Sequence, residues 1–173
     1  MKRNIIEVEG WLILLPIDKV ESISHFSCEH EEYNVFLREE ALRYEKLNIS
    51  RTHLLINSED SCILAYMSLV ADSVQLSKNE KVLVELGLVP FSTFPAIKIG
   101  KLAVDRNAGQ QYYGIGSLMI QLARGFTYNL NDCRGRYYVR YRLSCSCCRG
   151  NYRKCPFEKA SATKGVRING VTD

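Results

Sequence analysis

FPAIKIGKLAVDRNAGQQYYGIGSLMIQL, residues 94–122, contains the signals of a strand, a turn and a helix in succession. Its first part is an apolar run that contains Gly100, which predicts a buried strand with a β-bulge at that glycine. A short polar loop follows, and the second part predicts a helix. Gly114 and Gly116 lie where this helix opens, and without side chains their backbone N–H groups can face an anion at the positive end of the helix. The stretch therefore predicts a phosphate-binding turn.

Two glycines before a helix also occur in ordinary strand-to-helix turns, so only the surrounding residues can distinguish a phosphate-binding turn from an ordinary one. Residues 111–116, QYYGIG, fit the acetyl-coenzyme A motif Gln/Arg-x-x-Gly-x-Gly/Ala, and the block resembles the GNAT family of acyltransferases. Residues 94–105, which contain FPA and GKLAVD, resemble a narrower branch, the GNAT toxins of bacterial toxin–antitoxin pairs. In that family the loop amides hold the cofactor pyrophosphate, and the bulged strand pairs with the pantetheine arm.

The resemblance implies a single α/β domain over residues 1–173 with the GNAT fold, a mixed and mostly antiparallel central sheet flanked by helices. It also implies acetyl-CoA as the cofactor. The residues that would bind it are Leu102, Ala103, Val104, Gln111, Gly114, Ile115, Gly116 and Ser117. Tyr112 and Tyr113 depart from the family, because glycine and a basic residue are common there, and a tyrosine in place of glycine can obstruct the approach of an anion.

The catalytic candidate, Tyr152, comes from the C-terminal third. In the family, a tyrosine in a Phe-Tyr-x-x-x-Gly-Phe motif meets the leaving thiolate, and residues 151–157, NYRKCPF, have the same register. The resemblance thus implies that Tyr152 is the general acid. Asn151 and Pro156 replace the first Phe and the Gly of the motif, and the proline removes a backbone donor. Residues 143–173 are the divergent part of the domain, and a decayed, a frameshifted or a merely divergent tail all fit the sequence.

Positive charge is unevenly distributed, although the net charge is only +4. Between residues 134 and 159, basic side chains alternate with tyrosines, and Glu158 is the single acid. Such a stretch suits a nucleic-acid backbone, while the charge by itself slightly favours a solvated surface without a partner. The candidate RNA contacts are Arg136, Arg140, Arg142 and Arg153.

Resemblance to the toxin branch also covers residues 26–28, FSC, and residues 34–37, NVFL, which in the family lead into a helix bordering the acceptor cleft. It implies an N-acetyltransferase that acetylates the amino group of aminoacyl-tRNA and blocks translation. It further implies an antitoxin partner, and it leaves open a homodimer. Two alternatives stay open: a GNAT enzyme that acts on a small amine or a protein N-terminus, and a non-catalytic GNAT remnant, which the unusual tail favours.

The bulk composition fits one domain with a real core, since 46% of 173 residues are apolar. No apolar run approaches a membrane span and the N-terminus lacks a signal-peptide pattern, so we expect a cytoplasmic protein without a membrane segment. Four of the seven cysteines crowd into residues 145–155 without a nearby histidine, which favours free thiols over a zinc site. We expect no metal, and we expect Cys28 and Cys62 to be buried as small hydrophobic residues.

The remaining elements follow from periodicity and turn residues. They are a strand over 5–16 ended by Pro16, an amphipathic helix over 38–47, a hairpin over 49–56 and 62–70, a helix or ordered loop over 75–89 closing over the sheet, a helix over 117–130 and a strand over 137–143. The apolar stripe of the first helix is assigned to Phe36, Leu37, Ala41, Tyr44 and Leu47. His30 and His53 are expected to be solvated or hydrogen-bonded rather than catalytic bases, and Asp105 to cap loop amides.

Overall fold

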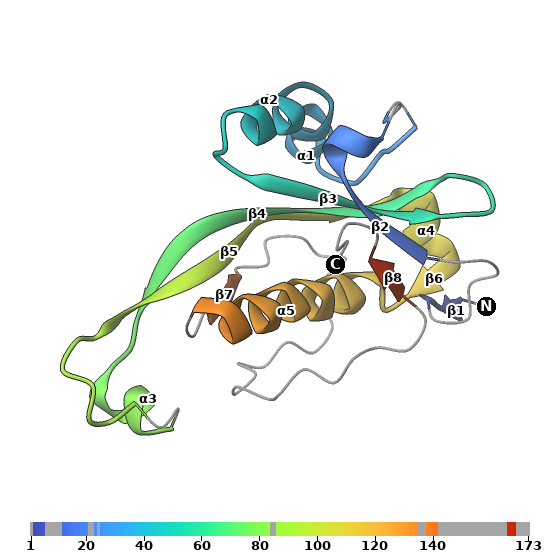
Figure 1. The fold of residues 1–173 in the computed structure, drawn as a ribbon. Helices are drawn as coiled ribbons and strands as arrows, with labels where there is room; N and C mark the ends of the chain where they lie inside the picture. The colour runs from blue at the N-terminus through green and yellow to red at the C-terminus, as the bar shows by residue number, and fades with distance from the viewer. Residues whose placement is uncertain are drawn as a thin grey trace.

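A six-stranded sheet lies between two layers of helices (Figure 1). The computed structural model describes residues 2–5, 12–20, 23, 25–83, 86–134, 138–141 and 166–168, and its side chains up to Thr127. The strand order is β7-β5-β4-β3-β2-β8. Each central strand is antiparallel to its neighbour, and these strands are β2 (Leu12–Pro16), β3 (Arg51–Asn57), β4 (Ile63–Gln75) and β5 (Thr93–Val104). The two edge strands pair in parallel, β7 (Tyr138–Tyr141) with β5 and β8 (Val166–Ile168) with β2.

The helices cover both faces of the sheet (Figure 1). One face carries α1 (Glu31–Val35), a π-helical turn (Phe36–Glu40) and α2 (Ala41–Lys46), and the other face carries α5 (Ile115–Arg134). Shorter elements are the 3-10 turn Ile17–Lys19, α3 (Lys78–Leu83), α4 (Arg106–Gln111), and a separate parallel pair of β1 (Arg3–Asn4) with β6 (Tyr112–Tyr113). The expected mixed, mostly antiparallel sheet flanked by helices is confirmed.

The predicted bulge in β5 is present at Gly100. Ser68 of β4 pairs with Lys101 and Leu69 pairs with Ile99, so Gly100 is the extra residue on β5. A Cβ atom at position 100 would lie 3.3 Å from a methyl carbon of Val70, tighter than most real contacts. The glycine therefore fits both the bulge and the close approach of the neighbouring strand.

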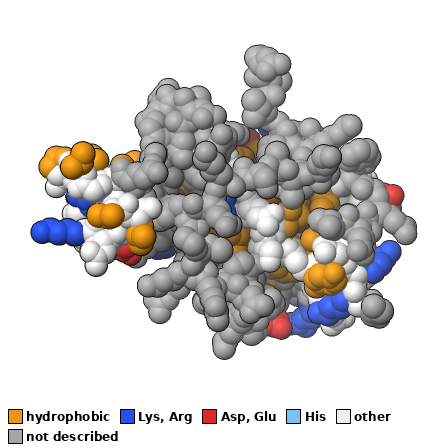
Figure 2. All heavy atoms as spheres, turned by 90° about the horizontal axis from the view of Figure 1, so that it is seen from below, with side chains coloured by type: hydrophobic (Ala, Val, Ile, Leu, Met, Phe, Trp, Pro, Cys, Tyr) orange, Lys and Arg blue, Asp and Glu red, His pale blue; other side chains and the backbone are white. Residues whose placement is uncertain are grey.

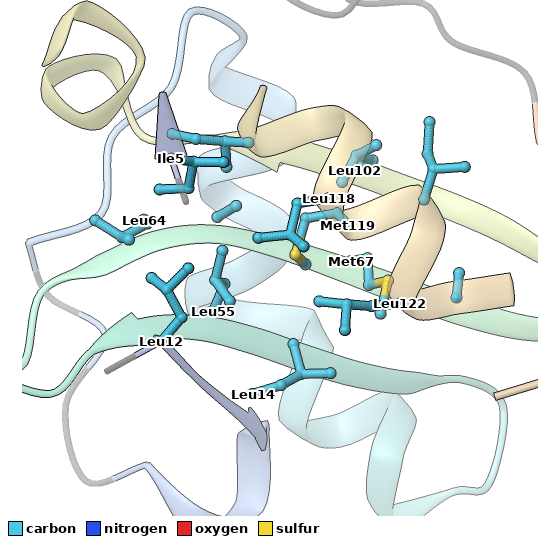
Figure 3. Close-up of a cluster of buried hydrophobic side chains, with 14 of the residues drawn as sticks. Ile5, Leu12, Leu14, Leu55, Leu64, Met67, Leu102, Leu118, Met119 and Leu122 are labelled. Atoms are coloured by element: carbon cyan, nitrogen blue, oxygen red, sulfur yellow. The ribbon is translucent and has the colours of Figure 1, made fainter. Parts of the chain in front are cut away.

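Each face of the sheet has its own apolar core. The core under α5 contains Leu14, Leu55 and Met67 from the strands and Met119 from the helix (Figure 3). The core under α1 and α2 is centred on Tyr66, whose ring packs edge-on against Phe26 at 5.3 Å and whose hydroxyl donates to the Tyr33 carbonyl at 2.9 Å. Burial raises the pKa of the Tyr66 hydroxyl, so this tyrosine stays protonated.

The amphipathic helix is confirmed, but it begins at Glu31 and includes the π-helical turn. Phe36, Leu37 and Ala41 are buried, as their place in the apolar stripe predicts. Assigning Leu47 to that stripe was wrong, because it is 58% exposed. The helix ends at Lys46, and the wider π-helical turn shifts the phase of the stripe before that end.

Several other predictions need correction. The segment over 75–89 does not close over the sheet, because α3 lies at the far end of the long β4–β5 ribbon (Figure 1). The expected polar loop after Asp105 is the helix α4. The break predicted at Asn131 is absent, since α5 runs on to Arg134, and asparagine and aspartate cost a helix interior only about 0.7 kcal/mol each.

The two isolated cysteines differ. Cys28 is buried as predicted, with 6% of its surface exposed. Cys62 is exposed, which contradicts the prediction, because it follows the polar turn between β3 and β4, where its N–H donates to Asp60 at 3.0 Å. The first predicted strand does end at Pro16, and residues 12–16 form β2, whereas Ile5, its expected first residue, is described and lies outside the strand. The strand predicted over 137–143 is confirmed over its described residues, 138–141, which form β7.

Candidate cofactor site

A pocket of about 480 Å³ lies where β5 ends and α5 begins. Its walls come from the N-terminal residues, the segment before α1, the end of β5, α4 and the glycine turn. The lining residues are Lys2, Glu29, Val104, Asp105, Arg106, Gly109, Gln110, Tyr112, Tyr113, Gly114, Ile115, Gly116 and Ser117. Residues 94–122 therefore supply most of the pocket.

Asp105 fixes the strand end of the pocket. One carboxylate oxygen accepts hydrogen bonds from the N–H groups of Asn107 at 2.9 Å and Ala108 at 3.1 Å, which caps α4. The other oxygen accepts from the N–H of Ser27 at 3.0 Å, and the Arg106 N–H donates back to the Ser27 carbonyl at 2.8 Å. The prediction that Asp105 caps loop amides is confirmed, and the carboxylate also joins α4 to the segment before α1.

The glycine turn has the conformation that the sequence predicted. Gly114 has a φ of +89°, a region that favours glycine, and its carbonyl accepts from the Leu118 N–H at 2.9 Å, so α5 begins directly after it. The N–H groups of Ile115 and Gly116 therefore precede the first intrahelical donor, Leu118, and have no acceptor within the helix. They lie on the pocket wall at the positive end of a 20-residue helix, which is a suitable position for binding an anion.

Two cations lie on the pocket wall, Lys2 and Arg106. The Lys2 ammonium donates to the carbonyl of Gly109 at 2.6 Å, which holds it against α4. Sequence analysis missed both residues. The position of Arg106 directly after the capping Asp105 is a signal that could have identified it, whereas no local pattern connects Lys2 with a turn more than one hundred residues away.

Tyr112 is packed into the core rather than standing free over the turn. It is 9% exposed and belongs to the cluster beneath α5. The Arg3 guanidinium lies 5.5 Å from the centre of its ring, and it donates to the Tyr112 hydroxyl at 3.4 Å. Tyr113, by contrast, is 54% exposed. The expected obstruction is thus reduced to the one tyrosine that faces solvent.

Comparison with solved structures identifies the fold of the chain. No protein-family model and no curated protein sequence matches the chain. The solved structure of AtaT complexed with acetyl-methionyl-tRNAfMet is similar over 78% of this chain and 79% of that chain, with a TM-score of 0.65 and 19% identity. A tyrosine-to-phenylalanine mutant of KacT matches over 80% of this chain and 82% of its own, with a TM-score of 0.65 and 21% identity.

A further similar structure is AtaTR bound with AcCoA, which has a TM-score of 0.60 and 20% identity, and covers 79% of this chain and 78% of its own. The chain has the GNAT fold. In this GNAT fold the described pocket lies at the residues that fit the acetyl-coenzyme A motif.

Five of the eight predicted cofactor residues line the pocket of this GNAT fold: Val104, Gly114, Ile115, Gly116 and Ser117. Leu102 and Ala103 direct their side chains into the two cores, so only their backbone could contact a ligand. Gln111 is exposed at the end of α4 and does not line the pocket, whereas its neighbour Gln110 does. The binding role of all eight residues stays a prediction.

The predicted catalytic and RNA-binding residues are placed only in part. Tyr152, Arg136, Arg142 and Arg153 lie outside the described residues. Arg140 lies on β7, in register with Lys98 of β5, so two basic positions are neighbours across these parallel strands.

His53 differs from its prediction in part, because its side chain is half-buried rather than freely solvated. Its Nδ1 atom is buried without a hydrogen-bond partner among the described residues, and its ring centre lies 4.7 Å from that of Phe126. Burial, assisted by the charge of Arg51, lowers the pKa of His53 to about 4. His30 is exposed, as predicted.

Two searches of the described residues gave no candidates. They contain no group of three or more His, Cys, Asp or Glu side chains placed to hold a metal ion, and the four clustered cysteines at 145–155 lie outside the described ranges. Within the described part of the chain, none of the helices has the length and apolar character needed to cross a membrane.

Proposed function

We propose that this chain is an acetyl-CoA-dependent N-acetyltransferase. The observation that carries the proposal is the pocket at the glycine turn, formed where a bulged strand meets the first turn of a long helix. Binding of AcCoA by the structurally similar AtaTR supports this cofactor. The residues that line the pocket support the same cofactor by their own chemistry.

The diphosphate of acetyl-CoA fits the glycine turn. The amides at Ile115 and Gly116, the positive end of α5 and the cations Lys2 and Arg106 all favour a dianionic group. Glycine matters at position 114 because any other residue would be strained at its positive φ of +89°. Residues of this chain would therefore bind and orient the phosphate end of the cofactor.

The bulged strand fits the other end of the cofactor. On one side, β5 stays paired with β4 as far as Val104, apart from the bulge at Gly100. On the other side, β7 pairs with β5 only from Ala96 to Ile99 among the described residues, so the edge of β5 beyond Ile99 can pair with a ligand. Acetyl-CoA, when bound, would supply an activated thioester. Tyr152 is the candidate donor of a proton to the leaving sulfur, and the acceptor amine has to be neutral in order to attack.

The acceptor that we propose is the amino group of an aminoacyl-tRNA, with an antitoxin as the partner that restrains the enzyme. Support comes from AtaT, which was solved in complex with acetyl-methionyl-tRNAfMet and, as a mutant toxin, with the C-terminus of its antitoxin AtaR. The neighbouring basic positions Lys98 and Arg140 are consistent with an RNA backbone. Acetylation of the aminoacyl group would remove the amine that translation needs.

Calorimetry with acetyl-CoA tests the cofactor. A Gly114→Glu, Gly116→Glu variant places two carboxylates in the turn and should abolish binding. A Gly87→Glu, Gly125→Glu variant is the charge-matched control: a Cβ at Gly125 meets nothing within 4 Å, and one at Gly87 makes only ordinary contacts. The control should bind like the unaltered chain. Absence of acetyl-CoA binding by the folded, unaltered chain would overturn the proposal.

A second experiment tests the proposed acceptor and the catalytic role of Tyr152. We expect transfer of radiolabelled acetyl groups to aminoacyl-tRNA, a salt-dependent mobility shift with RNA, and a large loss of turnover in Tyr152→Phe with little change in cofactor affinity. Acetylation of small amines without an RNA shift would replace the acceptor class. No turnover with any amine would favour the non-catalytic remnant.

A further inference from the structure

The N-terminal strap, defined as residues 2–5, lies along the glycine turn. Its strand β1 pairs in parallel with β6, with Arg3 opposite Tyr112 and Asn4 opposite Tyr113. Tyr113 directly precedes Gly114, so the pairing brings the start of the chain beside the turn that forms the pocket. Figure 1 shows β1 and β6 next to each other near the N-terminus.

Ile5 anchors the strap in the core. It is 2% exposed and belongs to the cluster that includes Leu118 and Met119 of α5 (Figure 3). Its Cγ2 atom would lie 3.6 Å from a Cβ at Gly114, and the Asn4 side-chain oxygen would lie 3.7 Å from it. The strap is therefore packed directly on the glycine turn and held there by the burial of a large apolar side chain.

Arg3 connects the strap to the residue that departs most from the cofactor motif. Its guanidinium covers the ring of Tyr112 and donates to the hydroxyl of the same residue. Tyr112 is consequently held between the core and the strap. A tyrosine in this position is compatible with an open turn because the strap provides a place for its ring.

Lys2 extends from the strap to the pocket wall. Its ammonium carries three N–H donors, and the hydrogen bond to the Gly109 carbonyl occupies one of them. That bond fixes the ammonium at the rim of the same pocket that Arg106 and the amides of the glycine turn line. The acidic residues on the wall are Glu29 and Asp105, and the Asp105 carboxylate already accepts three backbone hydrogen bonds.

We propose that the N-terminal strap is a structural part of the anion site and that Lys2 binds a phosphate of the ligand. The chemical class of the ligand is a diphosphate, and its identification as the diphosphate of acetyl-CoA rests on the proposed function. The strap thus has two roles at one site: it holds the turn in shape through Ile5 and Arg3, and it adds positive charge through Lys2.

The test is calorimetry of the full chain, with any purification tag at the carboxyl end so that the strap keeps its residues. Two probes are titrated, acetyl-CoA and inorganic pyrophosphate, at several salt concentrations. The variants are Lys2→Ala, Lys2→Arg and, as a matched control, Lys78→Ala, which removes an exposed lysine at the far end of the β4–β5 ribbon. Thermal unfolding of each variant checks that the fold is retained.

We expect Lys2→Ala to weaken binding of both probes about fivefold and to reduce the dependence of Kd on salt, as loss of one partly solvated charge contact should. Lys2→Arg should retain most of the affinity, and Lys78→Ala should bind like the unaltered chain. Equal affinity in Lys2→Ala and the unaltered chain, for both probes, would overturn the inference.

The two probes separate this inference from the proposed function. If pyrophosphate binds in a Lys2-dependent way but acetyl-CoA does not bind, the anion site stands and the cofactor proposal falls. If acetyl-CoA binds equally well with and without Lys2, the cofactor proposal stands and this inference falls. If neither probe binds the folded chain, both are overturned.

Discussion

The two ends of the β4–β5 pair are built differently. At the pocket end, residues 64–69 of β4 are buried without interruption, because helices cover both faces of the sheet there. At the ribbon end, residues 70–75, half-buried and exposed side chains alternate, which is typical of a strand with one solvated face. One continuous hairpin therefore changes from a two-sided core strand to a one-sided ribbon at Val70.

The contacts that stabilise the two ends also differ in range. Asp105 at the pocket end binds an N–H group 78 residues away, at Ser27. At the ribbon end, the Lys81 ammonium donates to the carbonyls of Val89 and Phe91, which are eight and ten residues away. A small cluster of Leu76, Phe94 and Ala96 lies there. Large apolar side chains nearby stay exposed, namely Val82, Leu83, Leu88 and Phe91, and Figure 2 shows hydrophobic side chains at this end.

Truncating one leucine at each end should give the largest contrast. Leu55 is fully buried beneath α5 and Leu88 is fully exposed. We expect Leu55→Ala to lower the free energy of unfolding by about 3–4 kcal/mol, through lost burial and a cavity, and Leu88→Ala to change it by less than about 0.5 kcal/mol. Urea unfolding measures both. A loss above about 2 kcal/mol in Leu88→Ala would mean that the ribbon end is packed more tightly than its exposure indicates.

A pair of aspartates gives a somewhat smaller contrast. Asp105→Ala removes the acceptor of three backbone N–H groups, so we expect a loss of about 3 kcal/mol in unfolding free energy. Asp72 at the ribbon end accepts from the adjacent Ser73 N–H, and Asp72→Ala should cost less than about 1 kcal/mol. Equal losses in chemical denaturation would show that the long-range bond to Ser27 contributes little.

His53, opposite Met67 and close to the boundary between the two ends, should give the smallest of the three effects. Its folded-state pKa of about 4 lies below the ordinary value of 6.5, so the unfolded chain takes up a proton first as the pH falls. Stability is therefore lost from about pH 6.5 down to about pH 4, by about 2 kcal/mol between pH 7 and pH 5.

The measurement is urea unfolding at both pH values for the unaltered chain and for His53→Phe. The phenylalanine cannot take up a proton, so the variant should lose about 2 kcal/mol less between pH 7 and pH 5. His30→Phe is the control, because His30 is exposed. The same acid sensitivity in His53→Phe as in the unaltered chain would assign the loss to other groups.

Sequence analysis predicted the features that local chemistry determines. Gly100 as a bulge, Asp105 as a cap and Gly114 in a tight turn each follow from the residue and its immediate neighbours. The prediction for Leu47 was wrong because the π-helical turn before α2 has no distinct local pattern. The position of α3 was wrong because periodicity predicts an element but does not place it in space.

The part of the site that could not be predicted depends on contacts across the chain. Lys2, Arg3 and Ile5 reach the turn only through the pairing of β1 with β6. Tyr112, judged from the motif alone, was expected to obstruct the site, and its burial beneath Arg3 could not be inferred without that pairing. Tyr152 and three of the arginines lie outside the described residues, so their roles stay predictions.

The pairing of β1 with β6 also has a consequence for how the chain folds. The β3–β4 hairpin and the β4–β5 pair join neighbouring segments and can form early, whereas the contact of Arg3 with Tyr112 closes a loop of 109 residues. During synthesis, the strap leaves the ribosome before the glycine turn does, so it can pair only after about one hundred further residues have been made. The anion pocket is therefore completed late in folding, and a partly synthesised chain that already has its central sheet still lacks a finished site.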